Sequence, residues 1–157
     1  MWYMKPVRVT IDVPQPREQV FDFLDVMSND EPFTNHMLQD WNYSGPERGI
    51  GSRAEVTVKA AGRSETVDME VIAAERPKTI VERNVGAGGR RIATGTYILD
   101  ELPGGHTRIT FEYAWQSAPL SERLSAPIVR SILRRGNERA MERLAEQLGQ
   151  LETTSVR

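Results

Sequence analysis

His36 is the side chain of this sequence that is best suited to acid–base chemistry. An imidazole titrates near neutral pH, so a histidine in a pocket can act as a general base. No serine elbow or paired carboxylate is recognisable around the motif FTNHM that contains it, so a solvent-facing histidine is the alternative. The other histidine, His106, lies in a PGGHT turn. Two distant histidines without cysteine or HExxH spacing argue against zinc, and we expect no metal or other cofactor.

Aromatic residues alternate along one C-terminal stretch with the period of a β-strand. Ile109, Phe111, Tyr113 and Trp115 share one face of that strand, and Tyr97 is expected to face the same way on the preceding strand. Core packing is one interpretation of this stripe. A buried tyrosine hydroxyl or indole N–H, however, needs a hydrogen-bond partner, which a ligand or water in a cavity can supply. We therefore treat Tyr97, Phe111, Tyr113 and Trp115 as candidate ligand contacts.

A glycine interrupts the apolar side of the C-terminal helix pattern. Alanine at position 136 would favour the helix by about 1 kcal/mol, so Gly136 predicts either a close approach of the sheet or a cavity. Asn137 lies at the margin of the same side, one turn from Leu133, where its amide can reach a bound molecule or be half exposed. We expect Leu133, Gly136 and Asn137 to line the site, together with Trp41 from the irregular segment 28–51.

Charged residues alternate with apolar ones between positions 79 and 85. In one register Arg83 points inward, and in the other Glu82 and Asn84 do. The sequence leaves both registers open. An inward arginine would need an acidic or ligand partner to offset its desolvation, and it could hold a carboxylate or enolate, so Arg83 is a further candidate ligand contact.

The elements that would position these residues are one strand, short helices, a meander of strands and a long helix. Alternation predicts a strand over 7–13, and helical spacing after Pro16 predicts a short helix, with a second short helix and an edge strand within 28–51. Further strand patterns, separated by the turns AAGR, ERPK and GAGG, fall near residues 52–60, 65–74, 79–85 and 91–100. The hairpin LPGGH leads into the last strand.

The pattern becomes helical from 119 to 151. Apolar or small residues recur four apart and predict a buried stripe, which consists of Leu124, Ile128, Ile132, Gly136, Ala140, Leu144 and Leu148. Pro127 removes a backbone donor and is expected to kink this helix or divide its first turns from the rest. We expect one domain over residues 1–152 and a frayed tail over 153–157.

Composition restricts the classes of function. The chain has 157 residues, 39% hydrophobic and 27% charged, which is typical of a water-soluble globular protein. Its net charge is −2, so it has no strong field for nucleic acid. No apolar run approaches a bilayer span and no leader pattern precedes the first strand, so we expect no stable membrane insertion and a cytoplasmic location. Whether the protein is a monomer or a homodimer stays open.

Four segments of the chain together resemble the polyketide cyclase/dehydrase and lipid-transport family of the START-like, SRPBCC helix-grip superfamily. They are VRVTIDVPQPREQVFDFLDV, GPERGIGSRAEV, TYILDELPGGHTRITFEYAW and APIVRSILRRGNERAMERLAEQL. The resemblance implies an α+β helix-grip fold: a seven-stranded antiparallel sheet wrapped around a long C-terminal helix, with two short helices after the first strand. It also implies a cavity between these elements, with the segment around His36 as its cover.

The sequence leaves three functional hypotheses. The first is a protein that binds a hydrophobic or aromatic small molecule, lipid-like or polyketide-like, in a cavity between sheet and C-terminal helix. The second is a metal-free aromatic polyketide cyclase or dehydratase, in which polar groups shuttle protons or stabilise an enolate. No catalytic motif of the family is recognisable, so no catalytic residue is assigned. The third is an interaction domain that binds a partner over its sheet or helix.

Overall fold

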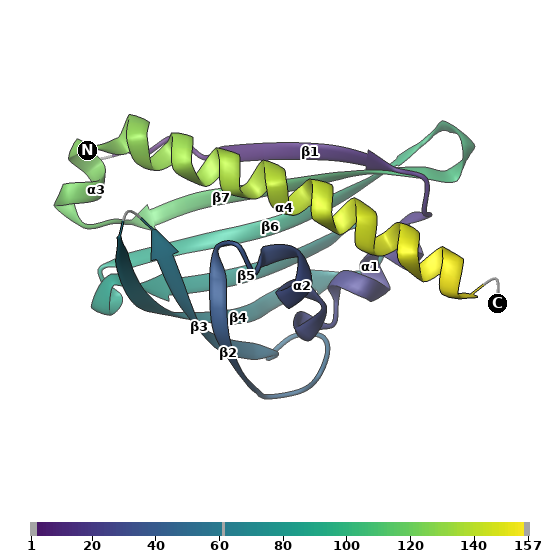
Figure 1. Ribbon diagram of the computed structural model, residues 1–157, viewed down its shortest axis with the longest axis horizontal. Helices are drawn as coiled ribbons and strands as arrows, with labels where there is room; N and C mark the ends of the chain where they lie inside the picture. Colours follow the sequence, from purple (N-terminus) through teal and green to yellow (C-terminus); the bar gives the residue numbers. More distant parts are fainter. Residues whose placement is uncertain (1–2, 61, 156–157) are drawn as a thin grey trace.

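The computed structural model describes residues 3–60 and 62–155. Within these residues, seven strands form one antiparallel sheet in the order β1-β7-β6-β5-β4-β3-β2. The strands are β1 (Val7–Val13), β2 (Leu38–Ser44), β3 (Arg53–Ala60), β4 (Arg63–Glu75), β5 (Thr79–Gly86), β6 (Arg91–Leu102) and β7 (His106–Ser117). The curved sheet and the long C-terminal helix that crosses it confirm the expected helix-grip architecture (Figure 1).

The helices follow the predicted order. They are α1 (Arg17–Leu24), α2 (Glu31–Thr34), α3 (Leu120–Leu124) and α4 (Ala126–Ser155), and a 3₁₀ turn over Met27–Asp30 joins α1 to α2. The expected break near Pro127 is present between α3 and α4. Pro127 is the second residue of α4, where its missing N–H removes no intrahelical hydrogen bond. Because α4 continues to Ser155 and residues 156–157 lie outside the described part, fraying of the tail stays a prediction.

The predicted apolar stripe of α4 is correct only in its C-terminal part. Ala140, Leu144 and Leu148 are buried, but Leu124 is 78% exposed and Ile132 is 48% exposed, and Ile128 between them is exposed too. A spacing of four residues drifts by about 40° per step around a helix of 3.6 residues per turn. Over several steps the stripe therefore rotates off the sheet, and Val129 and Leu133 take its place.

Two groups of buried side chains form the interior. The large cluster joins α1, α2 and the C-terminal part of α4 to the sheet, with Phe33, Ile80 and Leu144 among its members. The small cluster lies nearer the start of α4, where Trp115 and Ala93 pack with the partly buried Leu133. None of the described helices is long and apolar enough to cross a membrane.

Candidate functional site

The aromatic wall on β6 and β7 lies on the face of the sheet that packs against α4. Tyr97 and Trp115 are buried, and Phe111 and Tyr113 are partly buried against the large and small clusters respectively. The ring centroids of Tyr97 and Phe111 are 4.9 Å apart in an edge-to-face contact, as are those of Tyr113 and Trp115. The alternation read from the sequence is therefore confirmed, while a ligand-binding role for these four residues stays a prediction.

Gly95 makes room for this wall. A Cβ atom at position 95 would lie 2.8 Å from the Cζ atom of Phe111, so the Phe111 ring covers the glycine directly. Gly95 pairs with Glu82 on β5 and with Tyr113 on β7. Sequence reasoning missed this residue, although a glycine inside a strand is a signal of close approach.

The register of β5 places Glu82 and Asn84 inward. Glu82 is 7% exposed and Asn84 is partly buried, whereas Arg83 is exposed on the opposite face of the sheet. Arg83 is therefore wrong as an interior ligand contact. Ile80, two residues before Glu82, is buried in the large cluster, and alternation along the strand then decides the side on which each neighbour lies.

Two carboxyl groups meet in the interior. Asp30, the last residue of the 3₁₀ turn, is 5% exposed and interacts electrostatically with Glu82. Burial raises the pKa of Glu82 from its ordinary value of 4.5 to about 7. Burial, and then repulsion from Glu82, also raises the pKa of Asp30 well above its usual range. We call Asp30 and Glu82 the carboxyl pair. Burial raises the pKa of the Tyr97 phenol, and the nearby charges of Asp30 and Glu82 raise it further.

Three buried side-chain polar atoms, on the 3₁₀ turn, β5 and α4, have no hydrogen-bond partner among the described residues. They are Asp30 Oδ1, Asn84 Oδ1 and Asn137 Nδ2. Asn137 is 7% exposed, so the half-exposed position considered from the sequence is wrong and its amide is enclosed. Buried polar groups are almost always paired, so these atoms offer unused bonding capacity to a molecule that enters the interior.

These polar residues mark the boundary between the two clusters. Asn84 pairs with Met69 of the large cluster on one side and with Ala93 of the small cluster on the other. Asn137 lies one turn from Leu133 of the small cluster and from Met141 of the large one. We call Glu82, Asn84 and Asn137 the polar seam.

His36 is attached to α4. Its Nε2 atom lies 2.9 Å from the carbonyl oxygen of Gly136, to which it donates, and its Nδ1 atom accepts from Arg143 Nη1 at 3.0 Å. Both ring nitrogens therefore have partners and the side chain is partly buried, while a ligand contact by His36 stays a prediction. The adjacent Met37 lies directly over Gly136, where an added Cβ would collide with its sulfur. The glycine thus accommodates Met37, and neither the sheet nor an open cavity occupies that position.

Trp41 lies at the margin of the site. It is partly buried against the large cluster, donates its indole N–H to the carbonyl oxygen of Leu38 at 3.3 Å and stacks on Tyr43 with 5.6 Å between ring centroids. Its polar group therefore already has a local partner. A ligand contact by Trp41 would use its ring face.

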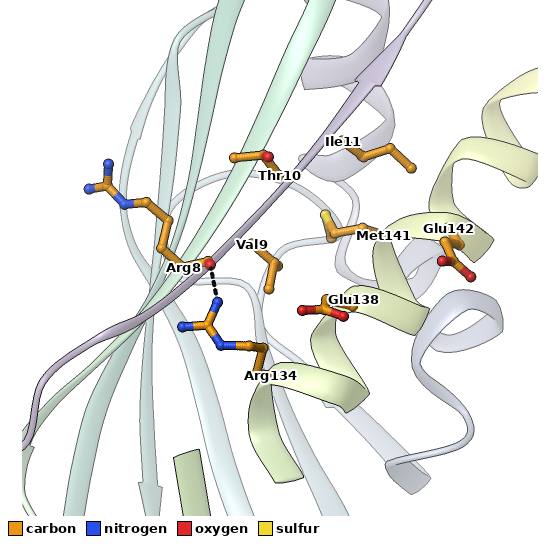
Figure 2. A pocket seen from close by; sticks show the side chains of 8 residues that line it. All are labelled: Arg8, Val9, Thr10, Ile11, Arg134, Glu138, Met141 and Glu142. Atoms are coloured by element: carbon orange, nitrogen blue, oxygen red, sulfur yellow. Dashed lines mark hydrogen bonds between the residues drawn. The ribbon is translucent and has the colours of Figure 1, made fainter. Parts of the chain in front are cut away.

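A surface pocket of about 510 Å³ opens between β1 and α4. Figure 2 shows Val9 and Met141 between the two elements and charged side chains around them, with a hydrogen bond of 3.0 Å from Arg134 to the carbonyl oxygen of Arg8. None of the ligand contacts expected from the sequence lines it. Within residues 3–60 and 62–155, no group of three or more histidine, aspartate or glutamate side chains could hold a metal ion.

Comparisons with known proteins agree with this fold. The family model described as polyketide cyclase / dehydrase and lipid transport matches residues 4–149. TTHA0849 from Thermus thermophilus is similar in structure with a TM-score of 0.73 and 18% identity, covering 92% of this chain and 97% of that chain. The Zhui aromatase/cyclase from Streptomyces has a TM-score of 0.69 and 15% identity, over 92% and 93%.

Ara h 8.0201 has a TM-score of 0.66 and 16% identity, covering 92% of this chain and 97% of its own. At such identities these three likenesses establish the fold alone. No curated protein matches the sequence.

Proposed function

Because the chain belongs to the polyketide cyclase/dehydrase and lipid-transport family, we propose that it binds a hydrophobic or aromatic small molecule between the sheet and α4. The observation that carries this proposal is the polar seam, in which buried atoms of Asn84 and Asn137 have no partner among the described residues, beside a wall of four aromatic residues. A site of this composition suits a mostly apolar molecule that is oriented by a few polar groups.

The polar seam supplies the orienting groups. Within the described part of the chain, Asn84 Oδ1 on the sheet is an acceptor without a partner and Asn137 Nδ2 on α4 is a donor without one. Leaving a buried polar atom unpaired costs about 1–3 kcal/mol. A ligand that forms hydrogen bonds with such atoms removes this cost. A core that only packs apolar side chains would not require these polar residues.

Met37 is the side chain that we expect to move when a ligand enters. It covers Gly136 with a flexible thioether, and beyond it the exposed Ile132 and Ile128 continue along the same side of α4 towards α3. Methionine changes its packing more readily than branched side chains do, because it is unbranched and has three rotatable side-chain bonds. Displacing Met37 would therefore connect the polar seam to an apolar entrance.

The test combines native mass spectrometry of freshly purified protein with titration of a hydrophobic fluorescent probe. Asn137→Leu fills the polar seam with an apolar side chain and is expected to weaken probe binding about tenfold or more. Asn42→Leu, at an exposed position of β2, is the matched control and should leave binding unchanged. Wild-type protein that carries no small molecule and binds no probe, or equal binding by both variants, would contradict the proposal.

The carboxyl pair favours a second candidate function, an enzyme of the cyclase or dehydratase type. The pKa of Glu82 is about 7, so its carboxyl can donate or accept a proton at neutral pH. The phenol of Tyr97 lies close enough to interact electrostatically with it. A copurifying ligand whose mass changes by the loss of water during incubation would support this candidate. Glu82→Gln should then retain the unchanged ligand.

A further inference from the structure

The interior contains two acids without a cation. Among the described residues, no lysine, arginine or histidine forms an ion pair with Asp30 or Glu82. The partly buried Arg91 is engaged by two other carboxylates, those of Glu65 and Glu122, and Arg143 is bonded to His36. A buried carboxyl that lacks a positive partner retains its proton, because desolvation disfavours the charged form.

The free carboxyl pair therefore holds at least one proton near neutral pH. Burial raises the pKa of both groups, and the charge of Glu82 raises that of Asp30 further, because two adjacent negative charges repel. Tyr97 on β6 is the third titratable group of the site and stays protonated. Protonation removes the cost of burying charge, but acceptor oxygens such as Asp30 Oδ1 still have no hydrogen-bond partner among the described residues.

Two acceptor oxygens and one amide donor of the interior lack partners among the described residues, besides the O–H groups that the carboxyl pair and Tyr97 retain. Asp30 Oδ1 and Asn84 Oδ1 are acceptors, and Asn137 Nδ2 is the donor. A ligand that donates hydrogen bonds and carries positive charge would bond to the first two and ionise the pair. A ligand carboxylate would add a third acid to the site and would be repelled.

We propose that the site selects a hydrophobic or aromatic molecule with a basic nitrogen, whose ammonium group binds between Asp30 and Glu82 while its apolar part lies against the aromatic wall. This inference rests on the proposed function and specifies its ligand. An ammonium ion donates up to three hydrogen bonds, and bonds to a carboxylate are stronger than neutral ones. Below the pKa of Glu82 both acids of the free pair are protonated, and binding the cation then expels one of the two protons.

Three probes of nearly equal shape test the proposal: naphthylmethylamine, naphthylmethanol and naphthoic acid. We expect the amine to bind about tenfold or more tightly than the alcohol, and the acid to bind most weakly. Calorimetry in two buffers that differ in ionisation enthalpy counts released protons. At about pH 6, below the pKa of Glu82, the amine should release close to one proton per molecule bound, and the alcohol should release none.

Glu82→Gln and Asp30→Asn keep the shape of each side chain and remove its charge. Either change should weaken the preference for the amine, because the ammonium group keeps only one acidic partner, while binding of the alcohol persists. Glu70→Gln is the matched control, because Glu70 is half-exposed on the other face of β4, opposite Arg53, and its loss should alter neither quantity. Thermal melts of all three variants establish that they fold.

The outcomes separate this inference from the proposed function. Binding of the alcohol without preference for the amine, or a preference that both Glu82→Gln and Asp30→Asn leave undiminished, overturns the inference alone. Binding of none of the three probes overturns the proposed function and the inference together. Tightest binding by naphthoic acid would mean that the site takes anions and would refute the assigned ligand class.

Discussion

Glu82→Gln should stabilise the protein at high pH and have little effect at low pH. The carboxyl of Glu82 has a pKa of about 7 in the folded protein, against an ordinary value of 4.5. Below pH 4.5 the folded and unfolded states both hold the proton. As the pH rises from 4.5 to 7 the unfolded chain ionises first, so unfolding becomes progressively easier, and above 7 the loss of stability is complete.

The magnitude follows from the two pKa values. Their difference, at about 1.4 kcal/mol for each pKa unit, corresponds to about 3 kcal/mol of stability lost between pH 4.5 and pH 8. Glutamine has nearly the same shape and no charge at any pH. The variant should therefore match the wild type near pH 4.5 and exceed it by about 3 kcal/mol near pH 8. Asp30 retains its own raised pKa, but a less raised one, because the repulsion from Glu82 is removed.

Urea unfolding at intervals between pH 4.5 and pH 8 measures this difference. Glu70→Gln, at a half-exposed site, is the control, and its difference from the wild type should stay within about 0.5 kcal/mol across the range. Comparing variants at each pH cancels the titration of the remaining surface carboxylates. A difference between Glu82→Gln and the wild type that does not change with pH would refute the argument that Glu82 is buried without a cation.

Three further predictions concern contacts of the cover and of α3. Gly136→Leu should lower the free energy of unfolding by about 1–3 kcal/mol by displacing Met37, and the added change Met37→Ala should restore most of that loss. Thermal melts measure both effects, and a Gly136→Leu variant that melts higher than the wild type would contradict this packing. Arg91→Leu should lower the urea midpoint by the equivalent of about 1–2 kcal/mol, because two partly buried glutamates lose their shared partner; an unchanged midpoint would show that the bridge is absent in solution. His36→Ala should cost about 1–2 kcal/mol through two lost hydrogen bonds, whereas His106→Ala in the exposed turn should cost nothing measurable, and equal effects would refute the attachment to α4.

Local periodicity was sufficient for most of the fold. Alternating residues along the last strand predicted that Phe111 and Trp115 share the helix-facing side, and the paired strands bear this out. Strand and helix periods are properties of neighbouring residues, so they can be read without knowing what the element packs against. Pro127 likewise indicated the break before α4, because the geometry of proline is local.

The side on which an ambiguous strand or helix is buried was decided by tertiary contacts. Both registers of β5 were open from the sequence, and packing of Ile80 into the large cluster placed Glu82 inward and Arg83 outward. The spacing of Leu124 and Ile128 extends the predicted stripe of α4, yet both side chains are exposed. Periodicity shows which residues of an element share a face. Whether that face is buried depends on elements from elsewhere in the chain that pack against it.

The chemistry of the site depended most on the tertiary structure. Asp30 belongs to a short turn without a periodic pattern, and only the placement of that turn over β5 brings it to Glu82, 52 positions later in the chain. The same holds for His36 and Met37, which meet Gly136 across a separation of about 100 residues. The sequence by itself determined a sheet, a long helix and an aromatic wall, because those follow from short-range patterns. The burial that keeps two acids protonated arises only when distant segments exclude water together.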